Sequence, residues 1–157
     1  MKKSVVFISL LLIVAVVSGI SGCVTSDILT PLPNTLNIIP PDPSIGEITK
    51  CSGIWKGTWD NPCLQATTIV LEKIGSDEVI GVYSFGSCGG SPAGSRKAFG
   101  KITNSSTIVL EWGEKELRRV VTLTLAGNKL KAEYRRASGK SNYTILTKVS
   151  TPTPKSP

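Results

Sequence analysis

The chain has 157 residues, with 18 Lys and Arg against 11 Asp and Glu, no His, four Cys and ten Pro. This length accommodates one domain, because neither end of the chain has the pattern of a folded core. The absence of His excludes Ser–His and Cys–His nucleophile pairs and His-containing zinc sites, so we expect a non-catalytic protein that uses no cofactor.

The first segment has the layout of an export signal. A basic start (1–3) precedes an apolar run of sixteen residues (5–20), and Ser21 and Gly22 then lead to Cys23. A spanning helix needs ~20 apolar residues, whereas this run is shorter and ends in small residues, as a cleavage site does. The order resembles the lipobox of prokaryotic lipoproteins. That resemblance implies cleavage after residue 22 and lipidation of Cys23; the alternative is an uncleaved signal anchor with an incidental cysteine.

Lipidation would determine where the protein is located. Two or more acyl chains, at ~0.8 kcal/mol per buried methylene, hold a protein stably on a bilayer. We therefore expect a lipid anchor at the extracytoplasmic face of a cell membrane. Val24 stands where lipoproteins of a Gram-negative inner membrane often carry Asp, so the resemblance implies the outer membrane in such a host.

Residues 23–50 are expected to be a tether. Five prolines lie at positions 31, 33, 40, 41 and 43, where fixed φ angles and missing amide donors favour extended, semi-rigid chain. Ile38 and Ile39 are the exception and are candidates for docking on the domain. The proline-containing tail 150–157 is expected to be disordered, which leaves residues 51–149 as the domain.

The domain consists of successive runs with strand periodicity. In the first run Trp55, Gly57 and Trp59 alternate with polar residues, which is the period of a half-buried strand. Seven further runs follow at 65–74, 78–85, 97–103, 107–112, 119–125, 129–136 and 142–149. The Gly127-Asn128 pair between two alternating runs is a strong hairpin signal. In the last run Tyr143, Ile145 and Val149 share one face.

Eight short strands with short connections predict an all-β, antiparallel up-and-down meander. Closure into a small barrel removes the two exposed edges of such a meander, and a two-sheet sandwich is the alternative. The opening segment Gly53-Ile54-Trp55-Lys56-Gly57-Thr58-Trp59 resembles the first strand of lipocalins and avidin-like barrels, together called calycins. This resemblance implies a barrel with a ligand site at its open end. The domain is shorter than a typical lipocalin, which argues against a large cavity.

The alternation of loops between the two ends of the meander predicts one disulfide. With Cys23 lipidated, Cys51, Cys63 and Cys88 remain in a compartment that permits disulfides. The first-to-second and third-to-fourth loops lie at the same end of an up-and-down meander, so we expect a bond between Cys63 and Cys88. A bond between Cys51 and Cys63 is the alternative. The spacing contains no CxxC pair, so zinc binding by the three thiols is disfavoured.

The charge of the domain favours anionic partners over catalysis. Residues 51–149 contain 14 basic and 8 acidic residues, which attracts anions, although a solvated basic surface is the simpler interpretation. Four acidic residues fall on the expected outer strand faces, where no catalytic pair is placed: Asp60, Glu72, Glu111 and Glu133. The glycine-rich segment 86–96 lacks the Lys-Ser/Thr ending and the helix of a phosphate loop.

We therefore expect a non-catalytic binding module with no metal site. Its ligand is expected to be a small apolar molecule or an anionic polymer of the cell envelope, near the 86–96 loop. Candidate ligand-binding residues are the aromatic side chains of the barrel, namely Trp55, Trp59, Tyr83 and Trp112. Nucleic acid is not expected as a partner, because the strands lack exposed aromatic faces for stacking bases. The alternatives are a protein-binding inhibitor, for example of an exported hydrolase, and a purely structural envelope lipoprotein.

Overall fold

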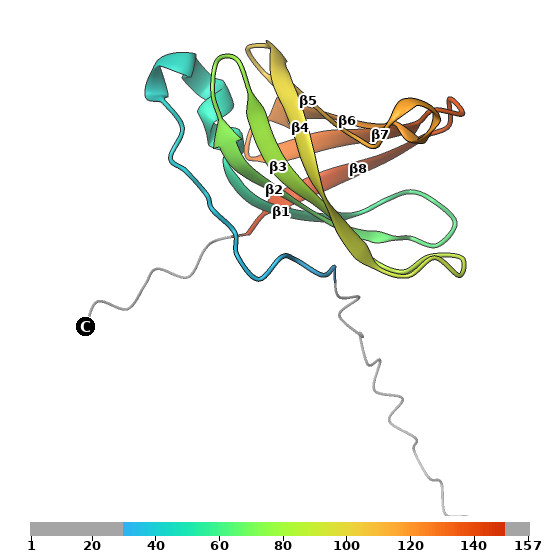
Figure 1. Cartoon of the computed structure of the whole chain (residues 1–157). Coiled ribbons are helices and arrows are strands. Elements are labelled where there is room, and N and C mark those ends of the chain that lie inside the picture. The colour runs from blue at the N-terminus through green and yellow to red at the C-terminus, as the bar shows by residue number, and fades with distance from the viewer. Residues whose placement is uncertain (1–29, 150–157) are drawn as a thin grey trace, which may run out of the picture.

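Eight antiparallel strands close into a barrel in the computed structural model, which describes residues 30–149 (Figure 1). The expected signal peptide (1–22), Cys23 and the tail (150–157) lie outside the described residues. The strands are β1 (Gly53–Thr58), β2 (Ala66–Ile74), β3 (Val79–Phe85), β4 (Gly94–Asn104), β5 (Thr107–Trp112), β6 (Arg119–Ala126), β7 (Lys129–Arg136) and β8 (Ser141–Lys148).

The topology confirms the predicted barrel and excludes the sandwich. Each strand pairs with the next along the chain, and β1 pairs with β8 through Trp55 opposite Lys148 and Lys56 opposite Thr147. Closure leaves no free sheet edge. Strand β4 begins at Gly94, earlier than the expected residue 97. The eight-stranded antiparallel barrel is compatible with the resemblance to calycins.

The apolar residues at every second position of the strands point inward and fill the interior, as the period-two pattern predicts. The fully buried inward side chains include Trp55, Ile69, Leu71, Ile108, Leu110, Val121, Leu123, Leu130 and Leu146. Gly100 and Gly81 of this wall lie so close to a neighbouring strand that an added Cβ would approach a backbone carbonyl oxygen within 1.9 and 2.6 Å, respectively. Both positions therefore require glycine.

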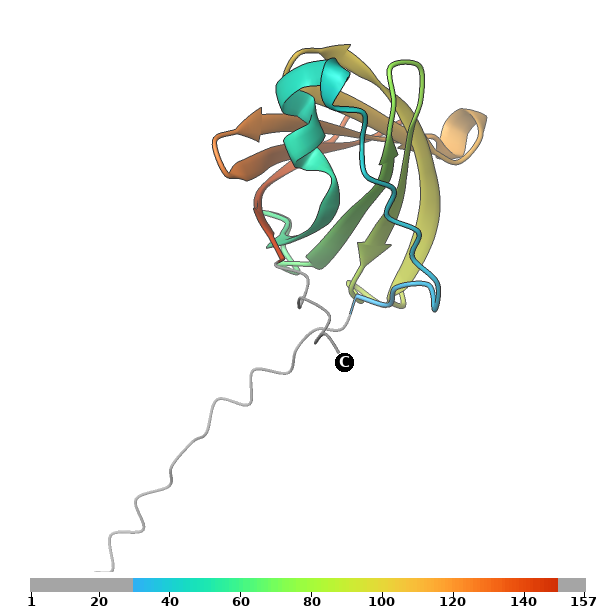
Figure 2. The ribbon, with the colours of Figure 1, turned by 90° about the vertical axis from the view of Figure 1, so that its left-hand side faces the viewer.

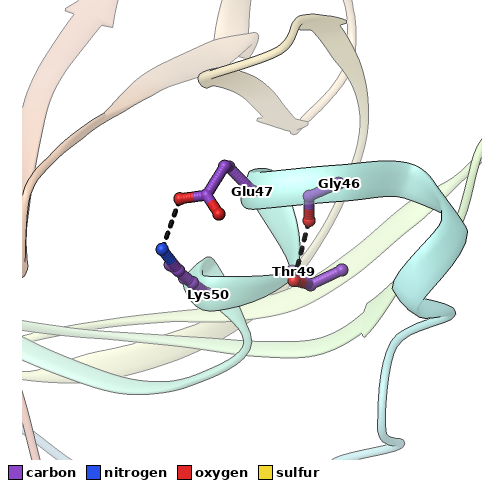
Figure 3. A network of polar contacts seen from close by, with 4 residues as sticks. All are labelled: Gly46, Glu47, Thr49 and Lys50. Atoms are coloured by element: carbon purple, nitrogen blue, oxygen red, sulfur yellow. Dashed lines mark hydrogen bonds and ion pairs between the residues drawn. The ribbon is translucent and has the colours of Figure 1, made fainter.

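One end of the barrel is covered by the 3-10 helix η1 (Pro43–Cys51), which lies across it in Figure 2. Ile48 and Cys51 of this helix are fully buried in the barrel core. On its exposed side, Thr49 donates a hydrogen bond to the carbonyl of Gly46, and Lys50 forms an ion pair with Glu47 (Figure 3). We call this the closed end.

The described part of the expected tether is instead packed on the barrel. Residues 30–39 run along the outside of β2 and β3, and we call this segment the strap (Figures 1 and 2). Thr30 hydrogen-bonds Thr68 at 2.6 Å, and Ser84 donates to the carbonyl oxygen of Pro31 at 2.7 Å. The tether prediction was wrong for residues 30–50 because proline-rich chain without an internal period can still bury side chains against a preformed wall.

Glu72 shows how the strap changes the wall beneath it. The expected solvent-exposed carboxylate is only 4% exposed. Its side chain accepts from the backbone N–H of Asn37 at 3.1 Å and from Lys97 Nζ at 2.5 Å, and its carbonyl accepts from the N–H of Ile39 at 2.7 Å. The buried charge is therefore satisfied by one cation and one amide. Ile39 itself stays exposed, whereas the side chain of Ile38 is half-buried.

The last strand presents the aromatic and aliphatic residues of its shared face to solvent. Tyr143 and Ile145 are 54% and 57% exposed, while Leu146, between Ile145 and Thr147, is the buried residue. The register explains this, because Leu146 lies opposite the inward-facing Leu130 of β7. Hydrophobicity alone gave no reason to choose the Leu146 face.

The predicted disulfide between Cys63 and Cys88 is present, with the Cα atoms 5.6 Å apart. It joins the β1–β2 loop to the β3–β4 loop at the end opposite η1. Cys51 is a free, buried thiol at the closed end, so the alternative pairing of Cys51 with Cys63 is excluded. Burial raises the pKa of the Cys51 thiol from 9.0 to about 11.

Candidate functional site

The end of the barrel opposite η1 is open, and we call it the mouth. Four connections surround it: β1–β2, β3–β4, β5–β6 with the short helix η2 (Lys115–Leu117), and β7–β8, all at the right of Figure 1. The cavity at the mouth has a volume of about 510 Å³. Its lining comprises Gln65, Tyr83, Phe85, Ser91, Arg96, Trp112, Gly113, Leu117, Arg119, Tyr134 and Arg136.

The floor of the cavity is a cluster of aromatic rings. The ring of Tyr83 stacks on Trp112 with a centroid distance of 4.4 Å, and it is nearly parallel to Tyr134 at 5.9 Å. Phe85 stacks on Tyr83 from the next inward position of β3, at 5.7 Å. Trp59 lies beneath these rings, 5.8 Å from Tyr134, and is 1% exposed. The floor therefore offers flat apolar faces with fixed positions.

The floor is electrically neutral. The indole Nε1 of Trp59 donates a hydrogen bond to the hydroxyl oxygen of Tyr83 at 3.0 Å. Burial, with a smaller contribution from nearby Tyr134, raises the pKa of the Tyr83 hydroxyl above its ordinary value. The phenol therefore remains protonated near neutral pH, and no negative charge arises on the floor to repel an anion.

Three arginines surround this floor, and none of the cavity-lining residues is acidic. Arg119 of β6 and Arg136 of β7 occupy directly opposite positions of an antiparallel pair. Like charges at such positions destabilise a sheet by ~0.2–1 kcal/mol. Within residues 30–149 no carboxylate forms an ion pair with Arg96, Arg119 or Arg136. A cluster of cations without counter-charges favours an anion at this place.

The residues paired across β5, β6 and β7 at the mouth place an aromatic ring next to the two opposed arginines. Trp112 of β5 pairs with Arg119, which in turn pairs with Arg136. The guanidinium carbon of Arg136 lies 6.0 Å from the ring centroid of Tyr134, within the range of a cation–π contact. Aromatic faces and guanidinium groups thus lie side by side at the mouth.

Hydrogen bonds and the disulfide fix the β1–β2 and β3–β4 loops relative to each other at the mouth. The amide nitrogen of Gln65 donates to the carbonyl oxygen of Gly86 at 2.7 Å, and the backbone N–H of Trp59 donates to the carbonyl of Gln65 at 2.9 Å. The disulfide between Cys63 and Cys88 links the same two loops. These contacts keep the aromatic floor and the β3–β4 loop in a fixed relation.

The structure brings together three of the four aromatic residues that the sequence suggested. Trp59, Tyr83 and Trp112 share the mouth cluster. Trp55 is separate: its Nε1 donates to the carbonyl of Cys51 at 2.7 Å, and Lys148 Nζ lies 5.4 Å from its ring centroid, at the closed end. Its position is that of a core residue.

The sequence candidates left out two aromatic residues of the lining, Phe85 and Tyr134, and its three arginines, Arg96, Arg119 and Arg136, of which only Arg96 fell in the expected 86–96 loop. A usable signal existed for some of them. Tyr134 lies on the inward face with Leu130 and Ala132, and one arginine of each consecutive pair must point inward at a strand end. The missing information was which strand ends meet, and that requires the pairing register.

Other site types find little support in the part of the chain that the structure describes. Residues 30–149 contain no cluster of three or more Cys, Asp or Glu side chains that could hold a metal ion. No helix among them is both long and apolar enough to span a bilayer. Comparisons with protein-family models, curated proteins and solved structures found no match to this chain.

Proposed function

We propose that this protein is a lipid-anchored, extracytoplasmic binding module with a calycin-like barrel. Its mouth takes a small ligand that combines a flat apolar body with an anionic group. The protein is not an enzyme in this proposal and uses no cofactor. The anchor is the thiol of Cys23, which the lipobox-like segment before it supports.

The opposed guanidinium groups of Arg119 and Arg136 carry the proposal. Their side chains face each other across β6 and β7 without a carboxylate partner. An anion between them converts a repulsive pair into charge-assisted hydrogen bonds, which contribute roughly 1.5–3 kcal/mol each. The rings of Trp112 and Tyr134 beside them supply the apolar contact.

The composition of the mouth favours binding over catalysis. The cavity lining contains no carboxylate or cysteine, the chain contains no His, and Tyr83 is held neutral. General acid–base catalysis near neutral pH needs a group that titrates in that range. Arginine does not titrate there, so the lining is suited to recognising charge rather than to moving protons.

The test is isothermal titration calorimetry of the mature protein in a non-ionic detergent. The probe is 2-naphthalenesulfonate, with 2-naphthol and methanesulfonate as the apolar and anionic halves, each corrected by titration into detergent alone. We expect the complete probe to bind more tightly than either half. The double variant R119Q/R136Q should lose about a hundredfold in affinity, because two charge-assisted hydrogen bonds at the lower end of that range amount to ~3 kcal/mol.

The matched control is K56Q/K101Q, which removes the same charge from exposed positions on the outer faces of β1 and β4. It should bind the probe as the unchanged protein does. Equal losses in R119Q/R136Q and in the control, or no binding of the complete probe, would refute the proposal.

A protein-binding inhibitor is the second candidate. Leu64 of the β1–β2 loop and Leu117 of η2 are 63% and 69% exposed on opposite sides of the mouth, and exposed leucines around an opening suit a protein interface. Native mass spectrometry of material purified from its host separates the two candidates. A small-molecule adduct supports the binding module, and a stoichiometric protein complex supports the inhibitor.

A further inference from the structure

A second cavity lies on the outer wall of the barrel, next to the mouth. It has a volume of about 450 Å³ and lies over β5, β6 and β7, between the β5–β6 loop and the β7–β8 turn. Four basic residues line it, namely Lys115, Arg118, Arg135 and Arg136, against the single carboxylate of Glu111. We call it the outer basic cavity.

The one acidic residue of the outer basic cavity is already paired. Glu111 Oε1 accepts a hydrogen bond from Arg118 at 2.5 Å. Within residues 30–149, Lys115, Arg135 and Arg136 form no ion pair. Glu114 and Glu116 belong to the same loop as Lys115 but do not line the cavity. The cavity therefore keeps three unpaired positive charges.

Arg136 joins this cavity to the mouth, because it lines both. The reason lies in the strand geometry. Successive residues of a strand point to opposite faces, so Arg135 points outward and Arg136 points toward the mouth at the end of β7. The two neighbouring arginines thus place positive charge on both sides of the same wall.

Resting on the proposed function, we propose that the mouth and the outer basic cavity form one continuous site for a linear, phosphate-bearing polyanion. The end of the chain carries the flat apolar body of the proposed ligand and occupies the mouth, with its first anionic group between Arg119 and Arg136. Its following anionic groups pass over the rim and contact Arg135 and Lys115. Guanidinium groups match the geometry of phosphate oxygens.

An extended ligand explains the arrangement better than a single small anion. One small anion fills one cavity and leaves the cations of the other without a partner. A chain that reaches both gains from effective concentration, because its second contact becomes intramolecular. The affinity therefore increases with chain length, and the contribution of each cavity can be removed separately.

The experiment compares four probes on the anchored protein in non-ionic detergent: orthophosphate, pyrophosphate, long-chain polyphosphate and 2-naphthalenesulfonate. The test variant is K115Q/R135Q, which alters only the outer basic cavity. The matched control is K129Q/K131Q, which removes the same charge from exposed, outward positions of the same strand β7. Thermal unfolding of each variant verifies that the barrel is intact.

In K115Q/R135Q we expect the affinity for long-chain polyphosphate to fall about tenfold, since two exposed charge contacts contribute ~0.7 kcal/mol each. Binding of 2-naphthalenesulfonate should remain unchanged. Polyphosphate should displace 2-naphthalenesulfonate from the unchanged protein, and R136Q should weaken both probes. Orthophosphate should bind more weakly than polyphosphate and be nearly insensitive to K115Q/R135Q.

Three results would overturn this inference. Equal losses in K115Q/R135Q and K129Q/K131Q would show a general charge effect. Simultaneous binding of polyphosphate and 2-naphthalenesulfonate would show two unconnected sites, while the proposed function would stand. Polyphosphate binding without any 2-naphthalenesulfonate binding would refute the proposed function, and with it the role of the mouth in a joined site.

Discussion

Removal of the disulfide is the sharpest test of how the mouth is held together. The bond between Cys63 and Cys88 closes a loop with a sequence separation of 25. In the chain-entropy model, loss of a cross-link of this size costs ~3.5 kcal/mol of unfolding free energy. Cys63 is exposed and Cys88 half-buried, so the variant C63S/C88S removes little packing and isolates the effect of the cross-link.

The assay is urea unfolding followed by tryptophan fluorescence, since Trp55 and Trp59 are both 1% exposed and change environment on unfolding. For a domain of this size, ~3.5 kcal/mol corresponds to a melting temperature about 15–25 °C lower. The m-value should increase, because the unfolded chain without a cross-link exposes more surface. A C63S/C88S variant with unchanged stability would refute the reasoning, as would an equally large effect of reducing agent on that variant.

Three further predictions concern the wall, the strap and the closed end. G100A should destabilise the barrel by about 1–3 kcal/mol in urea unfolding, because the new Cβ would meet a backbone carbonyl within 1.9 Å, whereas G75A, with 3.4 Å of room, should be nearly neutral. E72A should accelerate hydrogen exchange of the Asn37 amide, which loses its acceptor, while E72Q keeps an acceptor and should exchange more slowly than E72A; equal rates in both would contradict this account of the strap. The thiol of Cys51, whose pKa burial raises to about 11, should resist alkylation at pH 8 until the barrel unfolds. Because the folded pKa of Cys51 lies above the unfolded value of 9.0, the thiol contributes its full stabilisation below pH 9 and loses it as the pH rises through 11. The unfolding free energy of C51A should lack this fall between pH 9 and 11.

The barrel was predictable because its signal is local and repeated. Alternation in each run identifies a strand, and short connections imply that neighbouring strands pair. Because successive loops of a meander alternate between its two ends, the sequence alone is enough to pair Cys63 with Cys88. The prediction succeeded because none of these steps needs the exact register.

What failed depends on contacts that no local pattern encodes. The strap 30–39 has no clear periodicity, yet it is bonded to β2 and β3 through the side chains of Thr68, Glu72 and Ser84. Glu72 itself appeared to be a solvated charge because the cover over it lies more than thirty positions earlier in the chain. The rim arginines were visible as pairs, but their opposition across β6 and β7 follows only from the register.

The strap also has a consequence for the proposed anchor. The described chain begins at Thr30, which is bonded to Thr68 near the mouth end of β2, and Cys23 lies seven positions earlier. Seven residues span at most ~25 Å when fully extended, compared with roughly three times that reach if the chain were free up to η1. A barrel anchored through Cys23 with its strap docked is therefore held close to the bilayer by the half that carries the mouth. With that proposed anchor, the arginines and the aromatic floor lie in the half of the barrel nearest the membrane, where the proposed polyanion is to be bound.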